Sequence, residues 1–403
     1  MKMRVAGIVA EYNPFHNGHR YQIEATRRAG AECVVAVMSG NFVQRGEPAL
    51  LDKFTRAKAA LSCGVDLVLE LPLPFAAAGA QRFARGAVAL LDALGCVDTL
   101  SFGSECGALP PLLQAWLALE DERVRARLRA LLKEGQPFAA ARQQAVGELF
   151  GEDAGALLRQ PNNILALEYL GALGSLGSKI EPFTVPRKGA GHDSGAPVGA
   201  FASASALRAL AVKQGVSALS PYVPAEALAC YRGAPVCAPG ALELPLLSRL
   251  RALAPGELRA LPELSEGLEH RLYKAARQAR DLGELYALVK SKRYSHARVR
   301  RLALAAFLGV RDEDGALPPP YIRVLGYTPA GKELLTASSA ALPVGASLRR
   351  LQALGGRAQR LALLEAAAGD QYALLCSPRG ECGLDYTHPL IRSAGPHDKT
   401  CSG

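Results

Sequence analysis

Short apolar runs alternate with amphipathic segments along the N-terminal part of the chain. Residues 2–10 form a continuous apolar run that is rich in β-branched side chains and ends in a polar turn, which predicts a buried strand. Similar runs occupy residues 33–38 and 65–71, and helical spacing fills the intervals up to about residue 28 and over residues 52–62. This βαβαβ order predicts a parallel sheet with helices packed on its faces.

The same alternation continues toward residue 215. A helix is expected over about residues 76–94, a strand that ends in a glycine turn over 97–105, a helical stretch over 112–172, and a last strand over 180–185. Such an order is typical of an α/β fold with a Rossmann-like, doubly wound parallel sheet. We therefore predict one such domain over residues 1–215.

The remainder of the chain divides into two further parts. Residues 216–315 have helical spacing broken by prolines and contain no convincing strand, so we predict a helical region. Residues 316–403 are expected to form a small C-terminal α/β unit, with a strand over 321–327 and a helix beginning near 329–335. The polar tail from residue 393 is expected to fray.

Composition adds few constraints to this picture. The chain has 403 residues, 49% of them apolar, which suits two or three globular domains. The first apolar run leads into a polar motif rather than a cleavage site, and no apolar stretch is long enough to cross a bilayer, so we expect neither a signal peptide nor a transmembrane helix. The formal net charge of +10 suggests a polyanionic partner, although an arginine-rich composition gives the same charge.

The cysteines indicate the compartment. Nine cysteines are spread singly with no Cys-x-x-Cys pair, which is typical of reduced thiols in a cytoplasmic protein. Cys376, Cys382 and His388 are close in sequence, but their spacing fits no common zinc pattern and a fourth ligand is missing. We predict no metal site.

Three loops should meet at one edge of the predicted sheet. The loop after Ala10, residues 38–41 and residues 103–105 each follow a predicted strand. Ligands bind outside the carboxyl ends of the strands in sheets of this kind. We therefore expect the three loops to form one crevice.

The loop after Ala10 holds the strongest candidates for chemistry. His16 and His19 lie three residues apart with Gly18 between them, in a segment that opens a helix directly after a buried strand. Free amides at a helix start and two imidazoles suit an anion, and glycine allows a phosphate or an adenine to approach the backbone. Such donors can stabilise the charge on an attacked α-phosphate by roughly 3 to 4 kcal/mol each. An isolated pair could equally be capping or core histidines, but its position in the first βα unit favours a catalytic role for both.

A second candidate element contains hydroxyls followed by an arginine. Ser203 and Ser205 lie at a predicted helix start, and Arg208 follows one turn later, so together they could hold a triphosphate tail. Arg187 precedes a glycine-rich loop and could reach a phosphate. Each pattern is weak by itself.

Several other residues allow more than one interpretation. Asn162 and Asn163 follow a proline and could contact a ribose or a base, although helix capping is the commoner role of asparagine there. Gly103 is either a plain turn residue or a point where adenine approaches the backbone. Lys53 and Arg56 are expected to form a solvated helix face.

Taken together, these motifs resemble a known family. His16-Asn17-Gly18-His19 with the segment from Ser203 to Arg208 is similar to the nucleotidyltransferase superfamily, with Ala204 in a position that is usually small or hydroxylated. A longer set of segments resembles the bacterial tRNA(Met) cytidine acetate ligases over nearly the whole chain. The segments that carry this closer resemblance are residues 11–19, 38–48, 102–105, 161–163 and 292–294.

This resemblance implies an activity and a set of co-substrates. A member of the family uses ATP, with Mg²⁺ as a candidate companion, to convert acetate to acetyl-adenylate, and transfers the acetyl group to N4 of the wobble cytidine (position 34) of elongator tRNA(Met). Residues 1–215 are then a nucleotidyltransferase-like catalytic domain and residues 216–315 a basic tRNA-binding region. The resemblance, with the hydroxyl motif, implies ATP contacts at Val9, Ala10, Glu11, Tyr12, Asn13, Pro14, Phe15, His16, Asn17, Gly18, His19, Arg20, Tyr21, Gln22, Gly103, Asn162 or Asn163, Arg187, Ser203, Ser205 and Arg208.

The densest basic cluster is the candidate RNA contact. Helical spacing puts Arg293, His296 and Arg300 on one side, with residues 299, 302 and 306 turned toward a core. A solvated arginine-rich face is the alternative interpretation, but the neighbouring aromatic ring and the family resemblance favour RNA. The predicted tRNA-binding residues are Lys292, Arg293, Tyr294, His296 and Arg300.

Two alternative functions stay open from the sequence. A small-molecule adenylyl- or cytidylyltransferase would use the same histidines, but such enzymes are often close to one domain in length. A non-catalytic RNA-binding protein with a nucleotide-binding fold should have lost the histidine pair or the Ser-Arg motif, and both are present.

Overall fold

A mostly parallel central sheet organises the molecule. The computed structural model describes residues 4–188, 199–238, 240–264, 267–291 and 294–395. Its eight-stranded sheet has the order β10-β9-β5-β2-β1-β6-β7, with β12 also paired to β9. The strands are β1 (Val5–Ala10), β2 (Cys33–Ser39), β5 (Leu67–Leu71), β6 (Thr99–Ser104), β7 (Glu181–Pro186), β9 (Ile322–Tyr327), β10 (Val344–Gly345) and β12 (Ile391–Arg392).

The predicted βα units are confirmed, and their side chains explain the two-faced packing. Along β2, Val35 and Val37 pack into one core with helices α4 (Ala80–Ala93) and α9 (Pro161–Leu176), whereas Val34 and Ala36 pack into another with α1 (Asn17–Arg28) and α2 (Lys53–Ser62). Alternate residues of a strand point to opposite faces, so a fully apolar strand must be covered on both sides. The first helices are α1 (Asn17–Arg28), α2 (Lys53–Ser62), α3 (Leu73–Ala76) and α4 (Ala80–Ala93).

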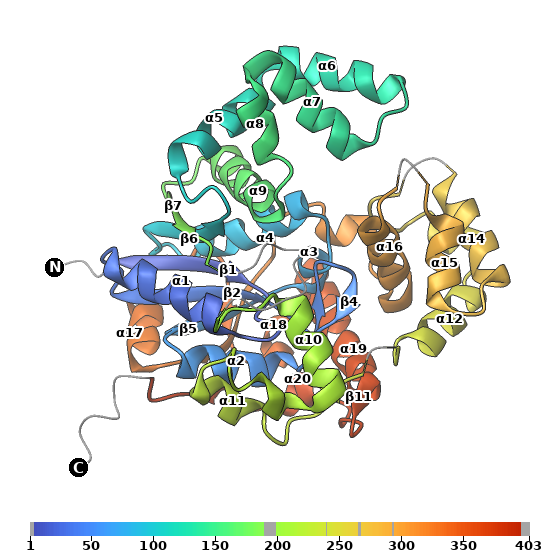
Figure 1. Cartoon of the computed structure of the whole chain (residues 1–403). Coiled ribbons are helices and arrows are strands. Elements are labelled where there is room, and N and C mark those ends of the chain that lie inside the picture. Colours follow the sequence, from blue (N-terminus) through green and yellow to red (C-terminus); the bar gives the residue numbers. More distant parts are fainter. Residues whose placement is uncertain (1–3, 189–198, 239, 265–266, 292–293, 396–403) are drawn as a thin grey trace.

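The expected helical stretch between β6 and β7 consists of five helices. These are α5 (Leu109–Glu120), α6 (Glu122–Lys133), α7 (Phe138–Phe150), α8 (Glu152–Leu157) and α9 (Pro161–Leu176). Helix α9 packs on α4 and β6, whereas α6 and α7 project away from the sheet at the top of Figure 1.

The predicted helical region after residue 215 is also helical, with one addition. The two-residue strand β8 (Val236–Cys237) was missed; it pairs antiparallel with β11 (Cys376–Ser377), a partner too distant in sequence to leave a local pattern. Helices α12, α14, α15 and α16 share a separate apolar core and lie to the right in Figure 1. The helices are α10 (Ala204–Gln214), α11 (Ala225–Tyr231), α12 (Glu243–Ala252), α13 (Pro255–Leu258), α14 (Leu268–Gln278), α15 (Leu282–Val289) and α16 (His296–Leu308), with 3₁₀ turns η1 (Val216–Leu219) and η2 (Asp312–Gly315).

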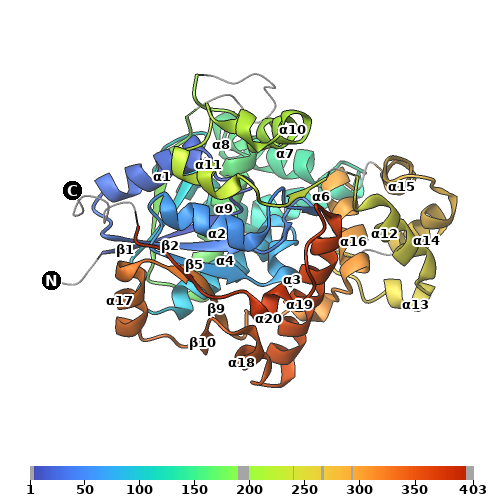
Figure 2. The same cartoon turned by 90° about the horizontal axis from the view of Figure 1, so that it is seen from below.

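The C-terminal segment has the predicted strand and helix, but its strands do not form a sheet of their own. Strand β9 pairs antiparallel with β5, so it extends the central sheet. Figure 2 shows β9 next to β5, with β10 on its other side. Ile322 and Val324 thereby enter the same core as the parallel strands. The remaining helices are α17 (Pro329–Ala337), α18 (Leu348–Gln352), α19 (Gly356–Leu375) and α20 (Leu384–Thr387).

The chain is ordered slightly further toward its C-terminus than the sequence predicts. Ser393 donates its backbone N–H to Tyr327 O, so the expected fraying does not begin at residue 393, and residues 396–403 lie outside the described part. Among the helices described, none combines the length and the apolarity that crossing a membrane requires.

Candidate active site

The three predicted loops do meet at the carboxyl ends of β1, β2 and β6. Strand order reverses between β1, which continues to β2, and β6, and this reversal is where α/β sheets leave a crevice for ligands. Arg56 of α2 joins two of the loops, because its Nη1 donates to Glu11 O at 2.6 Å and to Ser39 O at 3.1 Å, and its Nη2 donates to Gly40 O. Arg56 is 0% exposed, so the expectation of a solvated side chain is wrong.

The histidine pair opens α1, as the sequence predicts. His16 is the N-cap, and its Nδ1 accepts from Gly18 N at 3.0 Å, while Nδ1 of His19 accepts from His16 N at 3.2 Å. The two rings stack with centroids 3.8 Å apart, and Tyr12 packs edge-on against His19. The sequence leaves capping and a chemical role as alternatives for these histidines. The two roles are compatible, because the capping bonds use only Nδ1 of each ring and leave Nε2 for a ligand.

Both imidazoles are neutral near pH 7. Burial, with the charge of Arg187 as the next cause, lowers the pKa of His16 to about 3. Burial also lowers the pKa of His19 well below its ordinary value, reinforced by His16 and Arg187. A neutral ring whose Nδ1 accepts carries its proton on Nε2. Each ring therefore presents an Nε2–H donor, and neither is an imidazolium that could act as a general acid at neutral pH.

Two glycines border the crevice, and the packing requires the first of them. A Cβ on Gly18 would lie 2.9 Å from His16 Cε1, so any side chain there would displace the capping ring. At Gly103 a Cβ would lie 3.4 Å from Cγ of Arg187, which shows that the arginine lies across the end of β6. The predicted Gly103 and Arg187 are thus brought together.

Several other residues of the predicted stretch from Val9 to Gln22 pack in the core or bond to neighbouring elements. Tyr12 and Phe15 are core residues at 1% and 0% exposure. Arg20 pairs with Glu226 of α11 at 3.2 Å, and Gln22 donates to Ser101 O at 3.1 Å. Both side chains are therefore committed to structural bonds.

The remaining residues of the stretch either form the loop backbone at the crevice or bond to neighbouring segments. Asn13 Oδ1 accepts from Leu50 N, and Asn17 Nδ2 donates to Ala200 O. Val9 and Ala10 end β1, Pro14 follows Asn13 through a cis peptide bond, and Tyr21 lies under the Lys188 ammonium.

Glu105 caps α9, rather than either asparagine. Its carboxylate accepts from the backbone N–H of Asn162 at 3.2 Å and of Asn163 at 2.8 Å. Asn163 is buried, and its Oδ1 accepts from the amides of Glu105 and Cys106, so it holds the turn after β6. Asn162 instead accepts from Nη1 of Arg187 at 3.2 Å. Of the two asparagines, only Asn162 is joined to Arg187 through a side-chain bond that the structure describes.

The hydroxyl motif lies at the start of α10. Ser203 is the N-cap and accepts from Ala206 N at 3.3 Å, and its hydroxyl lies 3.1 Å from that of Ser205. Arg208 reaches back to the first loop, where it donates to Asn13 O at 3.0 Å and to Glu47 Oε1 at 3.1 Å. The motif is thus brought to the same crevice as the histidines.

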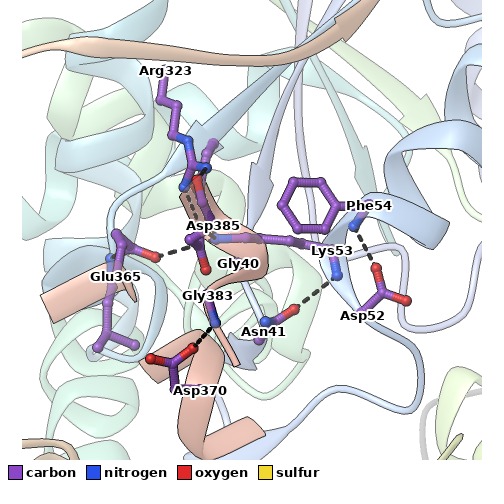
Figure 3. A network of polar contacts seen from close by, with 12 residues as sticks. Gly40, Asn41, Asp52, Lys53, Phe54, Arg323, Glu365, Asp370, Gly383 and Asp385 are labelled. Atoms are coloured by element: carbon purple, nitrogen blue, oxygen red, sulfur yellow. Dashed lines mark hydrogen bonds and ion pairs between the residues drawn. The ribbon is translucent and has the colours of Figure 1, made fainter. Parts of the chain in front are cut away.

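Lys53 is buried in an ion cluster beneath the crevice, contrary to the expectation of a solvated face. It is 1% exposed, lies 2.6 Å from Glu70 and pairs with Asp385, which Arg323 also contacts (Figure 3). Burial alone would lower the pKa of Lys53, but the carboxylates of Asp385 and Glu70 raise it. Glu365 completes the cluster, and burial beside Glu70 raises its pKa to about 8. The cluster joins α2 and β5 to β9, α19 and α20 from the far end of the sequence.

The predicted RNA-contacting helix begins later than expected. Lys292 and Arg293 lie outside the described residues. Helix α16 starts at His296, and Ser295 caps it by accepting from Arg298 N at 3.3 Å. Tyr294 lies 5.1 Å from the guanidinium of Arg298.

The inward face of α16 was predicted correctly. Val299, Leu302 and Ala306 are buried at 0%, 1% and 3% exposure, whereas the side chain of Arg300 is 41% exposed. The exposed face of the helix thus carries His296 and Arg300, and we call it the basic face of α16, whereas Arg301 is paired with Glu263.

Sequence reasoning missed three residues that hold the site together. Glu105, Arg56 and Glu47 act through backbone groups or arginines that are distant in sequence. Glu47 and Glu105 had a local signal, since they lie in the segments 38–48 and 102–105 that carried the family resemblance.

The cysteine and histidine cluster considered for a metal has other contacts. Cys376 Sγ contacts Tyr372 O at 3.5 Å, and the ring of His388 stacks on Phe54 at 3.8 Å. Over the residues that the structure describes, no group of three or more potential metal ligands comes together.

Comparisons with known proteins agree with this geometry. The family described as HIGH Nucleotidyl Transferase matches residues 3–381. The tRNA(Met) cytidine acetate ligase of Syntrophotalea carbinolica is 43% identical over 93% of this chain and 94% of the relative, and that of Thermoanaerobacter sp. strain X514 is 38% identical over 97% and 100%.

Solved structures extend the similarity to three dimensions. The crystal structure of Thermotoga maritima TmcAL bound with alpha-thio ATP superposes with a TM-score of 0.87 at 32% identity, covering 97% of this chain and 99% of the other. The apo structure of the same protein gives 0.89 at 33% identity over 97% and 100%. The chain therefore belongs to the HIGH Nucleotidyl Transferase family and, within it, to the tRNA(Met) cytidine acetate ligases.

Proposed function

We propose that this chain is an ATP-dependent tRNA(Met) cytidine acetate ligase. It activates acetate as acetyl-adenylate and transfers the acetyl group to N4 of the wobble cytidine (position 34) of elongator tRNA(Met). Relatives with this name cover 93% and 97% of the chain, and a structural neighbour was solved with alpha-thio ATP bound. Both point to ATP as the co-substrate.

The observation that carries the proposal is the pair of neutral imidazoles at the carboxyl end of β1. His16 and His19 are stacked and held by backbone bonds through Nδ1, which leaves both Nε2–H groups as donors. Donors fixed before the substrate arrives need no reorganisation when charge develops on a phosphate. Their low pKa values keep this arrangement unchanged across the neutral pH range.

The first half-reaction is an exchange at the α-phosphorus of ATP. A carboxylate oxygen of acetate forms a bond to phosphorus, the bond from phosphorus to the bridging oxygen breaks, and pyrophosphate leaves with the electron pair. His16 and His19 donate to the phosphate oxygens on which charge accumulates. No covalent enzyme intermediate is needed.

The second half-reaction uses the mixed anhydride that results. N4 of cytidine forms a bond to the acetyl carbon, the bond from that carbon to the phosphate oxygen breaks, and AMP leaves with the electron pair while N4 loses a proton. A carboxylate is a poor acyl donor until AMP becomes its leaving group, and one crevice that holds both partners makes the transfer effectively unimolecular.

The other crevice residues are assigned by their positions. Gly103 and Arg187 lie together across the end of β6, and Asn162 is joined to that arginine, so we assign Asn162 rather than Asn163 to the nucleotide. Ser203, Ser205 and Arg208 reach the crevice from α10 and are assigned to the triphosphate tail. The elongator tRNA contacts the basic face of α16 at His296 and Arg300 and the segment just before it, through phosphates.

Acetate-dependent pyrophosphate exchange tests the proposal. The full chain should incorporate labelled pyrophosphate into ATP only when acetate is present, and mass analysis of nucleosides should then find N4-acetylcytidine in added tRNA(Met). Exchange that requires a phosphorylated metabolite instead of acetate would indicate a small-molecule transferase. RNA binding without any exchange would indicate a non-catalytic binder.

A further inference from the structure

Glu47 joins the two predicted binding regions through one carboxylate. Its Oε1 accepts from Nη2 of Arg208, the arginine of the hydroxyl motif, at 3.1 Å. Its Oε2 lies 3.9 Å from Nη1 of Arg300, on the basic face of α16. The two arginines are distant in sequence, and only the fold brings them to the same carboxylate.

The hairpin that carries Glu47 is fixed against α16. Strands β3 (Phe42–Val43) and β4 (Glu47–Pro48) pair antiparallel, with Val43 opposite Glu47. Gly46 turns the hairpin with a φ of +74°, and a Cβ there would lie 2.6 Å from the backbone N of Arg301. The carboxylate is therefore held beside the helix, and the long arginine side chains are the groups that can move.

The two ion pairs differ in distance and in exposure. The side chain of Arg208 is 20% exposed, and its second nitrogen, Nη1, also binds Asn13 O. Arg300 is 41% exposed and stands 5.9 Å from the ring of Tyr286. With Arg208 on the carboxylate, Arg300 is the looser partner and is open to an incoming phosphate.

A triphosphate would change this sharing. A phosphate that draws Arg208 away from Glu47 leaves a full carboxylate charge facing Arg300, which then pairs with it more tightly. An arginine that is neutralised by a carboxylate is a weaker ligand for an RNA phosphate. Departure of pyrophosphate returns Arg208 to Glu47 and releases Arg300.

We propose that Glu47 is a positioning residue that makes triphosphate binding and tRNA binding mutually weakening, so that tRNA binds most tightly after pyrophosphate has left. This inference rests on the proposed function and adds an order of events to it. Because coupling between two ligands is reciprocal, each should weaken the other by the same factor.

The test compares the affinity of a tRNA(Met) transcript in the presence of α,β-methylene-ATP, which cannot form an adenylate, and of AMP. For exposed charges, the dissociation constant of the wild-type complex should be about three- to fivefold higher with the triphosphate. In Glu47→Gln the two constants should agree. The same variant should show a lower KM for ATP with unchanged kcat in acetate-dependent exchange, which a merely structural role would not produce.

Three comparisons decide the outcome. Glu284→Gln removes an equal charge from an exposed pair with Arg280 and should keep the wild-type ratio, which controls for general repulsion between triphosphate and RNA. Arg300→Gln breaks the link from the other side and should also lose the ratio, so the question is decided even if Glu47→Gln fails to fold. Equal ratios in wild type, Glu47→Gln and Arg300→Gln would overturn the inference while leaving acetate-dependent exchange, and hence the proposed function, intact.

Discussion

Residues at the crevice are positioned mainly by bonds to backbone groups. His16 and His19 form reciprocal bonds within the first turn of α1, and Gly18 is the residue that leaves room for the ring of His16. Lys53 and Arg56 sit on the next helix, where spacing alone predicted a solvated face, and both are buried. The histidine pair could be predicted because its bonds are local in sequence. The burial of Lys53 and Arg56 could not, because it depends on partners from other elements.

Replacing His19 by alanine tests the catalytic role proposed for that residue. Loss of an Nε2–H donor that acts on the α-phosphate should lower acetate-dependent pyrophosphate exchange by about two to three orders of magnitude. Binding of tRNA(Met), measured in parallel, should stay within about twofold because the basic face of α16 is unchanged. His270→Ala is the matched control, since that side chain is 59% exposed on α14. Wild-type exchange in His19→Ala would remove the catalytic assignment.

At the scale of elements, short polar contacts decide where helices begin and what they can present. Glu105 follows β6 and caps α9, so the strand end and the helix start are fixed together. Helix α16 is capped by Ser295, is buried on all sides from Leu302 to Leu308, and exposes basic side chains only over its first turns. The cap of α16 is local, because Ser295 accepts from the amide of Arg298, whereas the contact between Glu105 and the amides of α9 is visible only in the fold.

Glu105→Gln tests the cap of α9. An uncharged amide accepts less strongly from the two helix amides and interacts less with the helix dipole, so the free energy of unfolding should fall by about 1 to 2 kcal/mol. Urea denaturation measures this change. Glu152→Gln is the control, because Glu152 lies in the first turn of α8, is exposed and makes no capping bond among the contacts described. Equal losses in both variants would contradict the capping role.

Arg300→Ala tests the exposed face of α16. Removal of one phosphate contact should weaken tRNA(Met) binding uniformly and reduce the slope of log affinity against log salt by about one unit or less. Affinity should be titrated in AMP at several salt concentrations. Arg280→Ala, at a more exposed arginine that is paired with Glu284, provides the comparison. An unchanged slope would place the RNA on another surface.

At the scale of the whole molecule, the far end of the chain completes the central sheet. Strand β9 pairs with β5, and the cluster of Lys53, Glu70, Arg323, Asp385 and Glu365 connects the two ends of the sequence beside Gly40 and Asn41 of the loop after β2 (Figure 3). Buried ions of this kind are costly to leave unpaired. The loop after β2, which borders the crevice, therefore depends on residues that are far along the chain from the histidine motif.

The pH dependence of stability follows from Glu365. Its pKa is about 8 in the fold, because of burial and then of the neighbouring Glu70, whereas an ordinary glutamate titrates near 4.5. Between these values the folded state holds a proton that the unfolded state has lost, so stability should fall as the pH rises from about 4.5 to about 8 and then level off.

Urea denaturation between pH 5 and 9 measures this effect. The wild type should lose stability with a slope of up to about 1.4 kcal/mol per pH unit relative to Glu365→Gln, which cannot ionise. The oxygen of the glutamine can still accept from Leu73 N, as Glu365 does. Glu333→Gln on the exposed side of α17 should follow the wild type. Parallel curves for wild type and Glu365→Gln would show that Glu365 ionises normally.

The sequence by itself determined the βα units, the histidine motif at the start of α1, the helical middle region and the family. These follow from local physics: the period of apolar residues, the residues that begin helices, and motifs whose members lie within a few positions of each other. Only the tertiary structure decided that Lys53 and Arg56 are buried, that Glu105 and not an asparagine caps α9, that β9 joins the central sheet and that Glu47 lies between Arg208 and Arg300. Each of these depends on pairing between distant segments, because a charged side chain is buried when a partner for its charge or its hydrogen bonds comes from elsewhere in the chain, and no local pattern records where that partner is.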